Sequence, residues 1–268
     1  MARLLLNQAG VGAPEAVEYP VTVHFYGQVL PRLTSISLDR ARRVRWNMPE
    51  RDLWLHLIAE IEESKIHVEI HANKYALELF AVFHKCAFDV SRTAVELMSF
   101  TLGAGLYVEL LDFVGPDGIR EPMGCWTYPN LSRLCTSYSL ENGFEKMWEA
   151  VQVNPDIFGI LNDLIASITT PHVSVINCAR AIDGIRHLIS AKKNDWAAMH
   201  RALRVDAAYL IFISEHSKGP RHGNRGFVDG PTVSTILERS WTVMNRFLEY
   251  RKRNRGDLPE SEFPMLTG

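Results

Sequence analysis

The chain has 268 residues, of which 47% are hydrophobic and 22% charged, and its formal net charge at neutral pH is −2. This length allows two modest domains, and the composition is typical of a soluble globular protein. The small net charge provides no overall attraction to nucleic acid or to a membrane surface. No apolar stretch approaches the roughly 18 residues that span a bilayer, which argues against a membrane protein.

The cysteines show neither a CxxC pair nor the spacing of a metal site. Most of them lie in apolar or helical contexts, so we expect reduced thiols in a cytoplasmic protein. No glycine-rich phosphate loop of the Walker or Rossmann type is present, and we expect no metal and no other cofactor. The four cysteines are Cys86, Cys125, Cys135 and Cys178.

Two segments in the first half alternate apolar and polar residues, the pattern of a strand with one buried face. They are residues 17–26 and residues 65–71. The second segment places a lysine, a glutamate and two histidines on one face, which we interpret as an exposed polar face rather than half of a metal site. Residues 49–61 begin like a helix at Pro49, but their apolar stripe also fits a strand.

One long segment with helical periodicity, residues 74–100, predicts a helix with a buried face that ends at Gly103. Residues 106–114 then predict a strand, followed by a turn and a further strand. The first domain, which we place at residues 1–150, is therefore expected to be α+β, with an antiparallel sheet against a long helix. Nothing in its residues selects a role for it.

Beyond Asn154 the strand pattern ends, and four amphipathic segments predict the helices of a four-helix bundle. This all-α second domain covers residues 151–268 and ends in a Pro-rich tail. Residues 216–255 carry nine arginines and lysines against three acids, so this part of the chain is basic. The predicted helices cover residues 157–168, 173–189, 196–214 and 233–250.

The polar segment of residues 215–226, predicted as a loop between the third and fourth helices, is the main candidate for a functional site. Arg221 offers a planar guanidinium that can bind phosphate through two parallel hydrogen bonds. His222 beside it offers an imidazole, which suits proton transfer near neutral pH. The three glycines of the segment permit close approach of a ligand. The candidate catalytic residues are Arg221, His222 and His216, and the candidate substrate-binding residues are Lys218, Asn224 and Arg225.

A purely structural interpretation of the same residues also stands. The basic run can be a solvated face, and the segment can be a turn whose arginine pairs with an acid such as Glu215 or Asp229. The surroundings of Arg221 in the folded protein distinguish the two interpretations.

The bundle and its basic segment resemble the HEPN-like domains, helical domains of toxin–antitoxin, CRISPR-associated and abortive-infection ribonucleases. The resemblance covers about residues 155–255 and rests on an arginine followed by a polar residue, Arg221 and His222. The family motif has a further histidine, and residues 226–228, where it would fall, contain none. Arg180 and His187 have six residues between them but lie within a predicted helix, and we interpret them as helix-face residues.

This resemblance implies RNA-directed action in prokaryotic stress or phage defence, by a metal-independent endoribonuclease that works as a homodimer. On this interpretation Arg221 holds the phosphate and His222 is the acid or base. The alternative is a non-catalytic dimerising module whose basic segment binds RNA or an acidic protein partner. A small-molecule sensor, with its pocket in the α+β half, is a third alternative.

Overall fold

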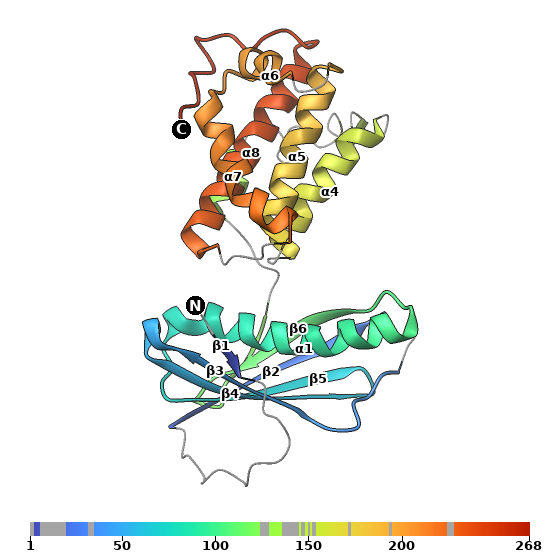
Figure 1. The fold of residues 1–268 in the computed structure, drawn as a ribbon, viewed down its shortest axis with the longest axis vertical. Helices are drawn as coiled ribbons and strands as arrows, with labels where there is room; N and C mark the ends of the chain where they lie inside the picture. Colours follow the sequence, from blue (N-terminus) through green and yellow to red (C-terminus); the bar gives the residue numbers. More distant parts are fainter. Residues whose placement is uncertain are drawn as a thin grey trace. The chain divides into compact units, whose positions relative to one another are not determined.

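The computed structural model describes residues 3–5, 20–31, 35–123, 129–135, 145, 148–149, 151, 154–170, 173–192, 195–223 and 228–268. The chain divides into two compact units, Met1–Cys125 and Trp126–Gly268. Figure 1 shows the first as a sheet with one long helix and the second as a group of helices. Within the described residues, no helix has both the length and the apolar composition needed to cross a membrane.

In its described part, the first unit forms a seven-stranded antiparallel sheet with the strand order β1-β3-β4-β5-β2-β6-β7. Helix α1 (Phe80–Leu102) lies along one face of this sheet (Figure 1). The expected α+β architecture is therefore confirmed. The strands are β1 (Arg3–Leu5), β2 (Val21–Leu30), β3 (Arg42–Met48), β4 (Leu53–Glu62), β5 (Lys65–Ala72), β6 (Tyr107–Val114) and β7 (Arg120–Pro122).

The core of the first unit lies between α1 and the sheet, because the strands alternate buried apolar and more exposed polar residues. Phe25 of β2 and Phe83 of α1 are both fully buried in this core. The polar residues of β5 lie on the opposite face, as the alternation predicts, and His71 there contacts Glu69 and Thr22 at 2.8 and 3.0 Å.

Residues 49–61 form a strand and not a helix. Only a single 3-10 turn, Pro49–Arg51, follows the helix signal at Pro49. The next residues enter β4, which pairs with β3 on one side and β5 on the other. The apolar residues of β4 point alternately into the core, so pairing on both sides stabilises the strand over the competing helix.

The second unit is all-helical in its described part, which confirms the other half of the expected fold. Its apolar core collects residues from every one of the longer helices, and Ile157, Ile185, Met199 and Phe247 are fully buried in it. The helices are α2 (Pro129–Leu134), α4 (Pro155–Thr169), α5 (Ser174–Ile189), α6 (Trp196–Leu203), α7 (Ala207–Arg221) and α8 (Gly230–Lys252).

Two expectations for this unit are wrong. The helix predicted over residues 196–214 is two helices, because Arg204 adopts a left-handed φ of 51° and Asp206 then caps α7 by accepting from the backbone N–H of Tyr209. The predicted loop of residues 215–226 is helical in its first part, since α7 continues to Arg221. The glycine and proline that suggested a loop, Gly219 and Pro220, lie in the last turn of α7, which ends directly after them at Arg221.

The Pro-rich tail after α8 packs back against the junction of α6 and α7. Leu266 donates its backbone N–H to the carbonyl of Arg204 at 2.9 Å. The buried guanidinium of Arg246 on α8 donates to the carbonyls of Leu203, Arg204 and Pro264 at 2.7–2.9 Å. This arginine holds the end of α6 and the tail to α8, just before the chain enters α7.

Candidate functional site

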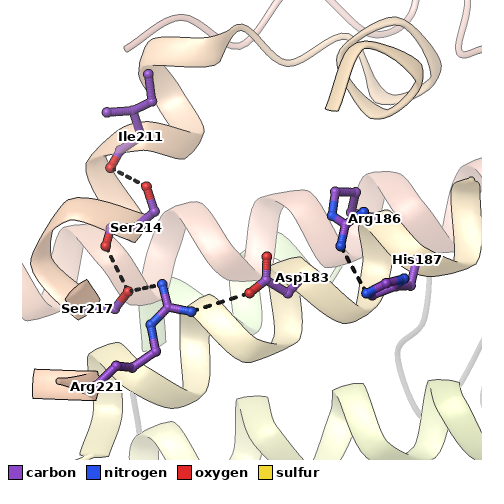
Figure 2. Close-up of polar contacts among 7 residues, drawn as sticks. All are labelled: Asp183, Arg186, His187, Ile211, Ser214, Ser217 and Arg221. Atoms are coloured by element: carbon purple, nitrogen blue, oxygen red, sulfur yellow. Dashed lines mark hydrogen bonds and ion pairs between the residues drawn. The ribbon is translucent and has the colours of Figure 1, made fainter. Parts of the chain in front are cut away.

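A partly exposed polar strip forms where the C-terminal end of α7 packs against α5. We define this polar strip as Asp183, Arg186 and His187 of α5 and Ser217 and Arg221 of α7 (Figure 2). Asp183, Arg186 and His187 follow one another along one side of α5, because residues three and four apart share a helix face. Ser217 and Arg221 have the same relation on α7. The strip therefore forms only when α5 and α7, which are not consecutive in the sequence, pack together.

The guanidinium of Arg221 is held by two partners. Its Nη1 atom lies 3.4 Å from Oδ2 of Asp183, and its Nη2 atom donates to the hydroxyl of Ser217 at 3.0 Å (Figure 2). The side chains of Arg221 and Asp183 are 34% and 40% exposed, so water reaches this ion pair. Ser217 is fully buried and its hydroxyl donates to the carbonyl of Ser214 at 2.8 Å. Arg221 is thus anchored by a buried group and an exposed one.

A second arginine of the strip, Arg186, is only 5% exposed. Its guanidinium lies over the ring of Trp196, 5.3 Å from the ring centroid, and Nη2 lies 2.9 Å from Nε2 of His187. A guanidinium can only donate, so Nε2 of His187 accepts and the proton of the neutral ring is on Nδ1. Within the described residues, Nε and Nη1 of Arg186 have no hydrogen-bond partner.

His222 directly follows α7, and both His222 and Arg221 are exposed. The backbone N–H of His222 donates to the carbonyls of Lys218 and Gly219, which caps the helix end. His222 and Arg221 therefore lie next to each other at the exposed end of α7. The end of α7 thus places two exposed polar residues, Arg221 and His222, beside the rest of the polar strip.

His216 lies away from this group, contrary to the role expected for it. It precedes Arg221 by five positions on α7, which turns the two side chains about 140° apart on the helix. Its Nδ1–H donates to the carbonyl of Phe212 at 2.7 Å, and its ring lies 4.7 Å from the ring of Phe212. His216 is therefore a packed helix residue on another side of α7.

Among the candidate substrate-binding residues, Lys218 is exposed one turn before Arg221 and lies on the same side of α7. Asn224 and Arg225 lie outside the described residues. Asp229, a suggested partner of Arg221, instead caps α8 through Thr232, whose hydrogen bonds lower the pKa of this carboxyl group. The acid that Arg221 contacts is Asp183 of α5. The arginine therefore pairs with an acid of its own chain, as the structural interpretation expects, although this acid is not one of the two suggested.

Sequence reasoning missed Asp183 and Ser217. Ser217 precedes Arg221 by four residues, a spacing that makes two residues neighbours on a helix. This spacing indicates a contact only if the helix extends to Arg221, which the sequence did not predict. Arg180 and His187 do lie within a helix, α5, as expected, and Arg180 pairs with Asp163 at 3.4 Å. In the part of the chain that the structure describes, no three histidine, cysteine or acidic residues gather as a metal site would require.

Comparison with known proteins assigns both units to one family. Residues 23–123 match the N-terminal domain of DUF8168, a domain of unknown function, and residues 144–252 match its C-terminal domain. Together the two matches cover more than half of the chain. The chain belongs to the DUF8168 family. No curated protein and no solved structure matches it. The polar strip lies entirely within the C-terminal DUF8168 domain.

Proposed function

We propose that this protein binds RNA through the polar strip of its second unit and that Arg221 holds one phosphate group of the RNA. The observation that carries the proposal is the state of Arg221, which is fixed by its own unit yet 34% exposed at a helix end. Within the described residues its contacts use two of the five N–H groups of an arginine. The remaining donors suit the parallel hydrogen bonds by which arginine binds phosphate.

The surroundings of Arg221 favour an anionic ligand. Lys218 and His222 are exposed beside it, and the segment of residues 216–255 is basic. An exposed ion pair such as Arg221–Asp183 contributes only about 0–1 kcal/mol, so a phosphate can replace the aspartate at small cost.

RNA cleavage is the second candidate function, and the adjacency of Arg221 and His222 favours it. In metal-independent cleavage a base takes the proton of the 2′-hydroxyl, and the 2′-oxygen attacks the phosphorus. The 5′-oxygen of the next nucleotide leaves with a proton from an acid, which yields a 2′,3′-cyclic phosphate and a 5′-hydroxyl. Each subunit supplies one such group in His222, so this candidate also requires a homodimer. Its setting in prokaryotic stress or phage defence rests on the resemblance to HEPN-like domains.

Fluorescence anisotropy with a short labelled single-stranded RNA, at about 50 and about 200 mM salt, tests binding. We expect Arg221→Ala to weaken binding about tenfold and to reduce the salt dependence by about one phosphate contact. Arg180→Ala is the matched control, because Arg180 is also exposed and also lies 3.4 Å from an aspartate. Equal losses in both variants would show that only the general charge of the unit matters and would overturn the proposal.

Incubation of the same RNA with the protein in excess chelator, followed by gel electrophoresis, tests cleavage. If the second candidate is correct, the wild-type protein releases fragments with cyclic phosphate ends, and His222→Gln abolishes them while RNA binding persists. Fragments that persist in His222→Gln would exclude this histidine as the acid or base. Intact RNA with the wild-type protein would leave binding as the function.

A further inference from the structure

We infer that the carboxylate of Asp183 occupies the position of an RNA phosphate on Arg221, competes with RNA for this arginine, and so limits RNA affinity. We further infer that Ser217 is the positioning residue that keeps Arg221 aimed when the phosphate displaces Asp183. This inference rests on the proposed function and concerns how Asp183 and Ser217 regulate the RNA affinity of the proposed site.

The length of the Arg221–Asp183 contact indicates an exchangeable partner. The Nη1 and Oδ2 atoms are 3.4 Å apart, whereas a charge-assisted N–H···O bond is shortest and strongest at about 2.7–2.9 Å. The side chain of Asp183 extends from the middle of α5, so its reach is set by the packing of α5 on α7. A free phosphate group has no such constraint and can approach the guanidinium to the optimal distance.

Ser217 anchors the arginine independently of the aspartate. A serine hydroxyl has one proton, and that of Ser217 is donated to the carbonyl of Ser214 at 2.8 Å. Its lone pairs are thereby turned toward Nη2 of Arg221, 3.0 Å away (Figure 2). Because Ser217 is fully buried, water does not compete for this contact. The arginine thus keeps one fixed hydrogen bond whichever anion takes the other side.

The decisive experiment compares Asp183→Asn with Asp163→Asn in the full chain, with the short labelled single-stranded RNA as the probe. Each substitution removes one negative charge from an aspartate that lies 3.4 Å from an arginine, but only the first releases Arg221. We expect Asp183→Asn to tighten RNA binding about two- to fivefold more than Asp163→Asn, the range set by an exposed ion pair. Ser217→Ala should weaken binding about threefold or more, because Arg221 loses its fixed hydrogen bond.

The outcomes separate the inference from the proposed function. If Arg221→Ala loses affinity while Asp183→Asn and Asp163→Asn behave alike, the competition is absent and the RNA site stands. If Asp183→Asn weakens binding, Asp183 positions Arg221 instead of competing for it. If Arg221→Ala binds RNA like the wild type, both ideas are overturned. In an Arg221→Ala background, Asp183→Asn should add no more than Asp163→Asn does, as a double-mutant cycle requires.

Discussion

The Nδ1 atom of His24 on β2 lies 3.2 Å from the Nε2 atom of His67 on β5, across the face of the sheet that points away from α1. Their rings also stack, with centroids 5.4 Å apart. One of the two nitrogens donates and the other accepts, so the pair accommodates one proton between them. A proton on both facing nitrogens would leave this contact without an acceptor, so one of the two nitrogens must stay unprotonated.

We predict that His24 makes the stability of the first unit depend on pH. Burial lowers the pKa of His24 from 6.5, and the nearby His67 lowers it further. A histidine whose pKa is lower in the folded state binds its proton more tightly when unfolded. Its stabilising contribution is therefore complete above pH 6.5 and is lost as the pH falls from 6.5 through the pKa of the folded state.

Urea denaturation on both sides of this pH measures the effect of His24. His24→Gln keeps a polar side chain but removes the titrating ring, so its stability should change less over the same range. Identical pH profiles for the two proteins would contradict the prediction.

His84 of α1 should show the same dependence more strongly. Its ring lies among those of Phe25, Phe80 and Phe88. Burial lowers the pKa of His84 to about 4, although the charge of Asp89 opposes the shift. The linked loss of stability between pH 6.5 and the folded pKa is on the order of 3 kcal/mol. In His84→Leu this position cannot titrate, so the difference between the two proteins in the pH dependence of the unfolding free energy separates the effect of His84 from that of the carboxylates. Parallel pH profiles of the two proteins would refute the prediction.

Packing between α4 and α5 leads to a prediction for two glycines. A methyl group added at Gly184 would lie 2.7 Å from Cγ1 of Ile160, a residue that is 3% exposed and has little room to move. We expect Gly184→Ala to destabilise the second unit by about 1–3 kcal/mol, despite the better helix propensity of alanine. The control is Gly159→Ala on α4, which should stabilise by about 0.5–1 kcal/mol because no described atom lies within 4 Å of the added methyl.

Denaturant unfolding of both glycine variants measures whether their unfolding free energies change in opposite directions, as predicted. Equal stabilisation in Gly159→Ala and Gly184→Ala would show that helix propensity outweighs the contact with Ile160. The close approach of α4 to α5 would then not depend on Gly184.

The fold was largely predictable where one physical pattern dominates. Residues 65–71 predict β5 because a strand with one buried face must alternate. Gly103 predicts the end of α1, and it adopts the left-handed φ of 61° that glycine allows. The break between α6 and α7 carries only the capping signal of Asp206, because Arg204, which turns the chain with a left-handed φ of 51°, is not a residue type that favours this conformation.

The candidate site was predictable only in part. Arg221 and His222 stand out by their chemistry and adjacency, and the structure places both at the exposed end of α7. Asp183 lies 38 residues before Arg221, and only the packing of α5 on α7 brings the two together. Gly219 and Pro220 predict a loop, although α7 continues through them. Because the sequence predicted a loop here, it gave no reason to expect the contact between Ser217 and Arg221, which depends on their spacing of one helical turn.

The proposed RNA site leads to a last prediction, on two exposed lysines. Lys218 lies one turn before Arg221, whereas Lys252 ends α8, a helix of 23 residues that spans about 34 Å. Since α8 begins near the end of α7 in sequence, Lys252 lies at the far end of that helix. We expect Lys218→Ala to weaken RNA binding about two- to fivefold and to lower its salt dependence, while Lys252→Ala changes neither, as measured by anisotropy. A larger loss from Lys252→Ala would place the RNA at the opposite end of α8, because screening at physiological salt confines each charge to about 8 Å.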